Sequence, residues 1–177
     1  MPVGDIGDPI QQYEFQTDYG RHPVIEYVRE NLYCIAFSNP SLNTELRTYI
    51  ISDAGVIDTS AEGTLLLVAP SGEQVHACRR PEQNIVVAYM EAGGNVGIEA
   101  VKVADDGTLT QHANHYCSAG TTGSFRFNLV YQRDSIVTLV TDHGNGQAYV
   151  ITFAVSDAGV VATPRKAFVS LEVVLST

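Results

Sequence analysis

The chain has 177 residues, of which 45% are hydrophobic, enough for a domain with a sizeable core and too many for a chain disordered throughout. A formal charge of −10 has the wrong sign for binding nucleic-acid phosphates or anionic lipid, so we expect neither nucleic acid nor membrane as a partner. With no signal peptide or long apolar run visible, we expect a soluble, acidic protein, and a cytoplasmic location is slightly favoured.

The first group of strand-like segments covers about residues 20–68. Its central run, residues 31–37, is apolar and aromatic; a weaker run at 23–28 precedes it, and runs at 46–51 and 64–68 follow. Asp53-Ala54-Gly55 suits a tight hairpin turn, because Gly accepts a positive φ and Asp can bond the following backbone. These segments predict a four-stranded antiparallel sheet.

The same succession of runs and turns occurs twice more. The Asp-X-Gly turns begin at Asp53, Asp105 and Asp157, which lie 52 residues apart. The flanking runs fall at 75–78, 84–89, 98–103 and 115–118, and then at 125–130, 135–140, 149–155 and 168–174. Four strands in about fifty residues are typical of a β-propeller blade. We therefore predict an all-β chain, residues 1–177 forming a single β-propeller-repeat domain with blades at about 20–68, 72–119 and 123–175.

The first repeat is also familiar in its details. Residues 13–20 (Tyr-Glu-Phe-Gln-Thr-Asp-Tyr-Gly), Pro23, residues 31–37 and the Gly55 turn resemble the blades of archaeal and bacterial surface-layer β-propeller repeat proteins. More distantly, they are similar to the blades of lactonase-type propellers. The resemblance implies a propeller scaffold and supplies no active-site residue, because no catalytic position of these families matches a position here.

Three blades are fewer than the roughly four to eight that close known propeller rings. Because an open arc would leave an apolar face wet at each end, we predict a homo-oligomer, with a dimer that closes a six-bladed ring favoured. Residues 10–17 occupy the place of an outermost strand, as do residues 168–174, so the chain holds one outer strand more than it needs. We expect one terminal segment to lie at the seam between chains.

The His and Cys residues do not predict a metal centre. His112, His115 and Cys117 are the one cluster that resembles metal ligands, but strand alternation puts His112 on the face opposite to the other two. The three cysteines, Cys34, Cys78 and Cys117, are too far apart in sequence for a paired metal knuckle and odd in number, so we expect free thiols. No cofactor is expected, although residues 142–146 and Asp105-Asp106 leave calcium open as a minority alternative to hairpin turns.

Catalytic residues cannot be assigned, because no Gly-X-Ser-X-Gly elbow is present and the five histidines have no visible Ser or Cys partner. Functional groups of propellers meet at the central channel, where the inner strand of each blade lies. The candidates for lining such a channel are Glu26, Arg79, Arg80, Arg126 and Gln132. The favoured function is a non-catalytic binding or scaffold module that closes a ring and takes a protein or glycan ligand. The alternative is a lactonase-like hydrolase or lyase with its site in the central channel.

Overall fold

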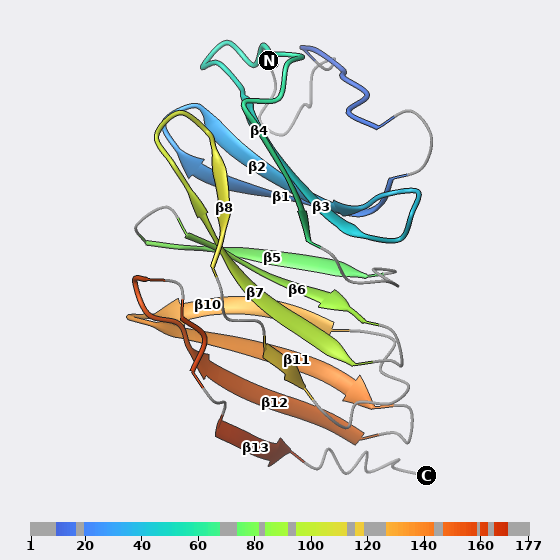
Figure 1. Ribbon diagram of the computed structural model, residues 1–177, viewed down its shortest axis with the longest axis vertical. Coiled ribbons are helices and arrows are strands. Elements are labelled where there is room, and N and C mark those ends of the chain that lie inside the picture. The colour runs from blue at the N-terminus through green and yellow to red at the C-terminus, as the bar shows by residue number, and fades with distance from the viewer. Residues whose placement is uncertain are drawn as a thin grey trace, which may run out of the picture.

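The computed structural model describes residues 10–16, 20–67, 74–81, 84–91, 95–112, 116–118, 127–143, 147–158, 160–162 and 165–169. Over these residues the protein is all-β and contains no helix, and its strands form three antiparallel sheets (Figure 1). Accordingly, no helix in this part of the chain is long and apolar enough to cross a membrane.

The strands of each sheet are neighbours in sequence. The first sheet has the order β1 (Arg21–Arg29), β2 (Leu32–Ser38), β3 (Thr44–Ile50) and β4 (Gly63–Leu67). The middle sheet has the order β5 (Val75–Arg80), β6 (Asn84–Met90), β7 (Val96–Val103) and β8 (Leu109–Gln111). The third has the order β10 (Phe127–Arg133), β11 (Ile136–His143), β12 (Gln147–Ala154) and β13 (Arg165–Val169). The prediction of three four-stranded antiparallel sheets is confirmed.

The outer edge of the middle sheet differs from the prediction. Only one outer strand was expected there, at residues 115–118. In the structure β8 pairs with one end of β7 and β9 (Tyr116–Ser118) pairs with the other. The outer strand is therefore formed in two short pieces, because three residues of pairing already follow the turn at Gly107.

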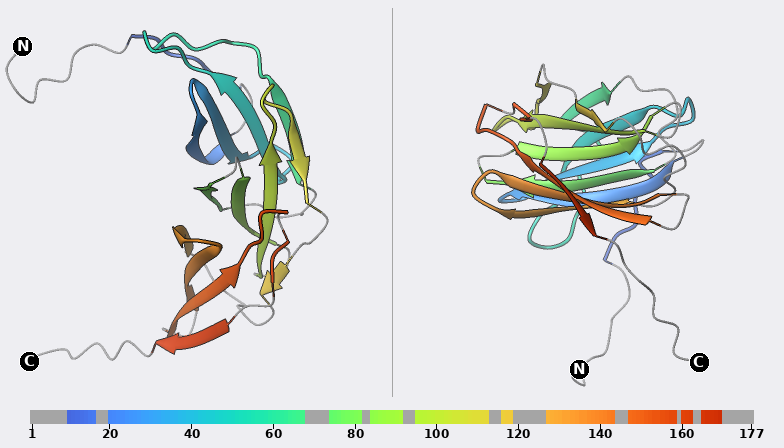
Figure 2. Two further views of the ribbon diagram at one scale, coloured as in Figure 1. Left: turned by 90° about the vertical axis from the view of Figure 1, so that its left-hand side faces the viewer. Right: turned by 90° about the horizontal axis from the view of Figure 1, so that it is seen from below.

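The three sheets are stacked face to face along an open arc (Figure 2). Their first strands lie next to one another, since β1 packs against β5 and β5 packs against β10. At the opposite edge β4 packs against β8. No sheet closes on itself. The first and third sheets lie at the two ends of the open arc, so each turns one face away from the rest of the stack.

The core consists of two apolar layers on the two faces of the middle sheet. Alternate residues of β6 point to opposite sides: Ile85, Val87 and Tyr89 join the layer shared with the first sheet, while Val86, Ala88 and Met90 join the layer shared with the third. All seven residues of β6 are buried. This two-sided burial explains why the strand is an unbroken apolar run in the sequence instead of an alternating one.

The Asp-X-Gly turns have the predicted backbone. The same hydrogen bond recurs every 52 residues, from the N–H of Ser52, Ala104 and Ser156 to the carbonyls of Val56, Thr108 and Val160. Gly55 has φ 79° and Gly107 has φ 85°, so the prediction of positive φ at two of the turn glycines or more is confirmed, while Gly159 lies outside the described residues.

In two of the turns a serine side chain, and not the aspartate that we expected, bonds the following backbone. The hydroxyl oxygens of Ser52 and Ser156 accept the N–H groups of Val56 and Val160 at 3.1 and 3.0 Å. The aspartates that follow, Asp53 and Asp157, are exposed. Their carboxylates are thereby left available for contacts outside their own turns.

The described part of the predicted terminal strand at 10–17, residues 10–16, does not form a strand. Residues 10–16 run as an irregular segment across the face of the first sheet that the middle sheet leaves open. Side-chain contacts hold the segment there: Tyr13 and Phe15 pack edge-on against rings of the sheet, and Gln11 bonds both backbone groups of Ile57. These contacts fix the segment without a strand partner.

Candidate functional site

Two of the five predicted channel residues meet where β1 packs against β5. The backbone N–H of Arg79 donates to the carboxylate of Glu26, and the Arg79 guanidinium attracts the same group. Burial nevertheless outweighs both contacts and raises the pKa of Glu26. The Arg79 guanidinium also lies over the ring of Tyr27, 5.1 Å from its centroid. The inner edge of the stack thus carries a half-buried carboxyl that is bonded to the Arg79 backbone and attracted by the Arg79 charge.

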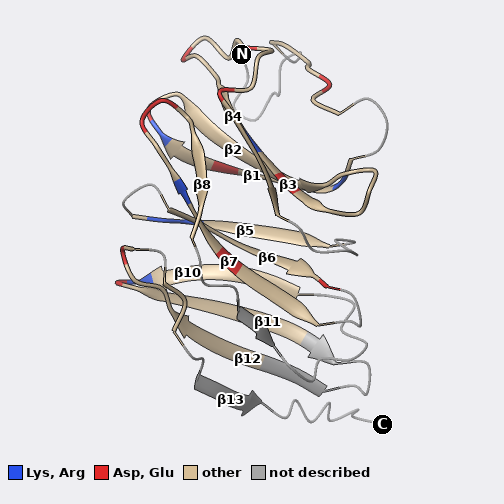
Figure 3. Cartoon of the chain, in the orientation of Figure 1, with Lys and Arg blue, Asp and Glu red and all other residues tan. Residues whose placement is uncertain are grey.

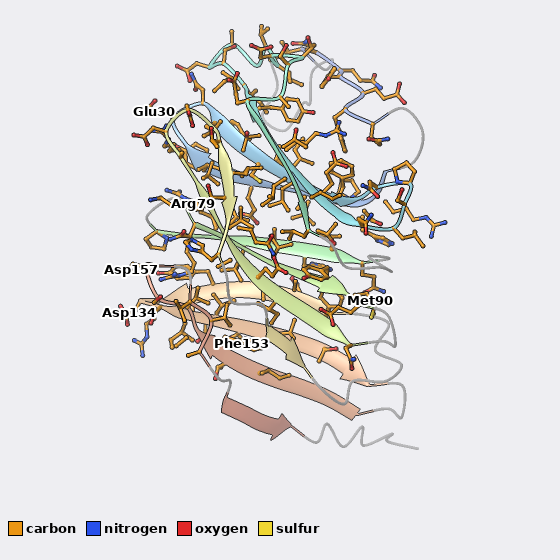
Figure 4. The ribbon with its side chains drawn as sticks, viewed as in Figure 1. Glu30, Arg79, Met90, Asp134, Phe153 and Asp157 are labelled. Atoms are coloured by element: carbon orange, nitrogen blue, oxygen red, sulfur yellow. The ribbon has the colours of Figure 1, made fainter. Side chains whose placement is uncertain are left out.

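Arg80 has a different place. It is 1% exposed and points between the middle and third sheets. Its guanidinium donates to the carbonyl of Ser156 at 2.9 Å and to that of Asp134 at 3.4 Å, and lies 3.5 Å from a carboxylate oxygen of Asp157. Figure 4 shows Asp134 and Asp157 together at the edge of the third sheet, where β10 turns into β11. Arg80 therefore ties two sheets together and does not lie open to solvent.

A second arginine, which the sequence analysis missed, makes the equivalent tie between the first and middle sheets. Arg29 ends β1, and its guanidinium lies 2.9 Å from a carboxylate oxygen of Asp105 and also bonds the Asp105 carbonyl. The Arg29 and Arg80 ties span 76 and 77 residues to the aspartates of two successive turns. In both cases the arginine at the end of an inner strand holds the Asp-X-Gly turn of the following sheet. The signal that could have found it is an arginine at the end of each predicted inner strand.

Gln132 does not join this cluster, since it is exposed on β10. Arg126 lies outside the described residues. The structure thus brings together Glu26 and Arg79, assigns Arg80 to a contact between sheets, and leaves Gln132 on the surface.

Both end sheets carry apolar side chains on their open faces. On the first sheet Ile25, Tyr27 and Leu66 are 54%, 44% and 44% exposed. On the third sheet Val130 and Val140 are 49% and 42% exposed. Charged residues gather mainly at turns and strand ends, and much of the strand area is uncharged (Figure 3). Exposed apolar strand faces of this kind mark association surfaces.

The segment 10–16 covers the outer part of the first sheet's open face. Tyr13 packs against Tyr49 and Phe15 against Phe37, with ring centroids 5.8 and 5.0 Å apart. Arg47 of β3 donates to the carbonyl of Phe15 and to the side chain of Gln16. An open hollow of about 500 Å³ lies along this segment, lined by Gln12, Tyr13, Glu14, Phe15, Gln16, Gly20 and Pro23.

The predicted free thiols are found at Cys34 and Cys78, and both are buried. Burial, with the nearby carboxylate of Glu26, raises the pKa of each thiol to about 12. Because the thiolate is the reactive form, neither cysteine is suited to nucleophilic or redox chemistry in the native protein.

The residues considered for metals are only partly described. Within the described residues no group of three His, Cys, Asp or Glu side chains is placed to hold a metal ion. His115 and residues 144–146 lie outside that part of the chain. The pKa of His112 is lowered by burial and by Lys102, and Asp105 pairs with Arg29.

Comparison with known proteins adds no relative. No protein-family model matches the chain, and no match was found among curated proteins or among solved structures. The resemblance to surface-layer and lactonase-type propellers therefore stays a prediction.

Proposed function

We propose that this protein is a non-catalytic β-propeller module that assembles with itself into a ring and binds a protein or glycan ligand through the loops and inner strands of that ring. Two chains supply six sheets, a number within the range of closed propellers. The arrangement of inner strands β1, β5 and β10 side by side supports a propeller, since these strands surround the axis when such a stack closes.

The observation that carries the proposal is the contrast between the middle sheet and the end sheets. Both faces of the middle sheet are buried, whereas each end sheet exposes apolar side chains on one face. Covering apolar area contributes about 25 cal/mol for each Å² removed from water. A sheet from a second chain is the partner whose shape matches, because sheets of this same chain cover the equivalent faces elsewhere.

The mass in solution tests the assembly. Size-exclusion chromatography with light scattering is expected to give twice the chain mass of 19.1 kDa, or about 38 kDa, at micromolar concentration. A species of one chain mass at tens of micromolar contradicts the ring. A trimer contradicts the six-sheet stoichiometry.

The Glu26–Arg79 pair favours a second candidate function, the lactonase-like hydrolase or lyase. A partly buried carboxyl with a raised pKa, within the electrostatic influence of an arginine, is an arrangement found at acid–base sites. A panel of lactones assayed with the parent chain and with Glu26→Gln separates the two functions. Turnover that Glu26→Gln abolishes while the assembly stays intact supports the enzyme.

A further inference from the structure

The arginine that ends the third sheet's inner strand has the same backbone setting as Arg29. Arg29 and Arg133 both follow a register shift in their strands, and each pairs with the first residue of the next strand. Each is followed by a residue of positive φ, Glu30 at 41° and Asp134 at 53°. The two arginines are 104 residues apart, which is twice the spacing of the turns. Arg133 is therefore the third member of the series that Arg29 and Arg80 begin.

Arg133 has no following sheet within its own chain. It is exposed, and the part of the chain that the structure describes gives its guanidinium no ion-pair or hydrogen-bond partner. The Arg29 side chain points to the face of the first sheet that packs on the middle sheet. The buried residue Ala36 lies on the same face. The residue 104 positions after Ala36 is Val140, on the open face of the third sheet. The equivalent reach of Arg133 thus leads away from the stack.

The opposite end of the stack carries the matching turn. Asp105 and Asp157 each receive an arginine from the preceding sheet, but Asp53 belongs to the first sheet, which no sheet precedes. Asp53 is exposed and has no arginine or lysine partner among the described residues. One chain thus offers an unused cation at one end and an unused anion at the other.

The segment 10–16 packs on the first sheet in the way that the first sheet packs on the middle sheet. A Cβ on Gly107 would lie 2.5 Å from Glu62, which directly precedes the outer strand β4 of the preceding sheet. A Cβ on Gly55 would lie 2.8 Å from Ile10. The corresponding members of the two pairs, the two glycines and residues 10 and 62, are again 52 positions apart. Residue 10 therefore lies against the first sheet as residue 62 lies against the middle sheet. Residues 10–16 therefore fill the place that the outer strand of a preceding sheet would take, and they leave the inner part of the face, at Ile25 and Tyr27, uncovered.

We propose that chains join head to tail, with Arg133 of one chain held by the Asp53 turn of a second copy. The open face of the third sheet then lies on the part of the first sheet's open face that residues 10–16 leave uncovered. This assignment rests on the proposed ring and specifies its seam. In a closed two-chain ring the same seam forms twice, so every substitution at it acts at both places. Opposite charges at such a position fix which faces pair and in which register.

Charge reversal tests the seam. Arg133→Glu and Asp53→Arg are each expected to raise the dimer dissociation constant by about tenfold or more, because each places like charges together at both seams. The double variant Arg133→Glu/Asp53→Arg restores opposite charges and is expected to recover the dimer. Lys102→Glu makes the same change of charge at an exposed position on the middle sheet and is the matched control.

The dissociation constants are measured by sedimentation velocity over a dilution series, with circular dichroism to confirm that each variant is folded. Recovery of the dimer in the double variant alone supports the pairing. A dimer that both single variants leave unchanged overturns the Arg133–Asp53 seam while the ring stands. A parent chain that is monomeric throughout overturns the ring and the seam together.

A covalent cross-link gives a second readout that does not depend on affinity. Asp53→Cys and Arg133→Cys chains, each in a Cys117→Ser background, are mixed and treated with a short bis-maleimide, which spans the length that the arginine side chain spans and a direct disulfide does not. Cys34 and Cys78 are buried and do not compete. The seam predicts a covalent heterodimer on a non-reducing gel. If only homodimers form, the proposed contact is wrong.

Discussion

Replacing Gly63 by Ala tests how closely the first two sheets approach each other. Gly63 begins β4, and a Cβ at this position would lie 2.4 Å from the carbonyl oxygen of Gly107 in the turn of the middle sheet. The same carbonyl accepts a hydrogen bond from the Thr48 hydroxyl at 2.7 Å. Because the obstructing atom belongs to the backbone, the added methyl group has to push the turn away from β4.

The expected cost follows from three contributions. Overpacking at a close contact costs about 1–3 kcal/mol. Loss of the Thr48–Gly107 hydrogen bond costs about 0.5–1.5 kcal/mol. Ala reduces the freedom of the unfolded chain relative to Gly and offsets about 0.4–1 kcal/mol of this. We therefore expect Gly63→Ala to lower the free energy of unfolding by about 2 kcal/mol, or the melting temperature by about 4–8 °C.

Urea unfolding followed by tyrosine fluorescence and by circular dichroism measures the change, since the chain has nine Tyr and no Trp. Gly20→Ala is the matched control, because a Cβ at Gly20 would meet the side chains of Gln16 at 3.5 Å and Phe15 at 3.9 Å, both ordinary contact distances. An unfolding free energy for Gly63→Ala within about 0.5 kcal/mol of the parent would refute the close approach of the two sheets.

Three further changes probe other parts of the structure. Arg80→Ala is expected to lower the free energy of unfolding by about 2–4 kcal/mol in urea titrations, because it leaves the carbonyls of Ser156 and Asp134 without their buried donor. Arg79→Ala, at an exposed position, is expected to lower it by about 1 kcal/mol or less. Equal losses in the two variants would contradict the tie between the sheets. Burial lowers the pKa of His76, and the nearby His22 lowers it further. The imidazole is therefore protonated at a higher pH in the unfolded chain than in the folded one, so the free energy of unfolding falls as the pH drops from about 7 to 5. His76→Phe should flatten that fall, and an unchanged slope in urea titrations at each pH would count against it. In a Cys117→Ser chain, Cys34 and Cys78 should react with a thiol reagent about 100-fold more slowly when native than in urea, and fast native labelling would show that the thiols are accessible.

The sheets could be predicted from the sequence because their signals are local. Each Asp-X-Gly turn brings its own glycine conformation and its own flanking runs, so the position of Gly55 relative to residues 46–51 already fixes a hairpin. The fate of residues 10–16 is not local in this way. The alternation of Tyr13 and Phe15 suits a strand as well as an irregular segment, and only the distant rings of Tyr49 and Phe37 decide between the two.

The candidate site could be predicted only in part, for a related reason. Arg79 and Arg80 are adjacent in sequence and point to opposite sides of β5, so one meets Glu26 and the other enters the layer beside the third sheet. Which side faces which sheet depends on how whole sheets pack, and strand alternation alone does not contain that information. The ties made by Arg29 and Arg80 cross 76 residues, so an arginine at the end of an inner strand does not by itself reveal its partner in the sequence.

The two-sided burial of β6 gives the molecule an uneven resistance to opening. Amide hydrogens of β6 are bonded on both edges and lie between two apolar layers, so their exchange with solvent requires the whole stack to come apart. The amides of β1 belong to a sheet with one exposed face and can exchange when that sheet alone detaches. Hydrogen exchange should therefore be slowest at the centre of the chain and faster toward either end, and closing the ring should slow the ends toward the rate of the centre.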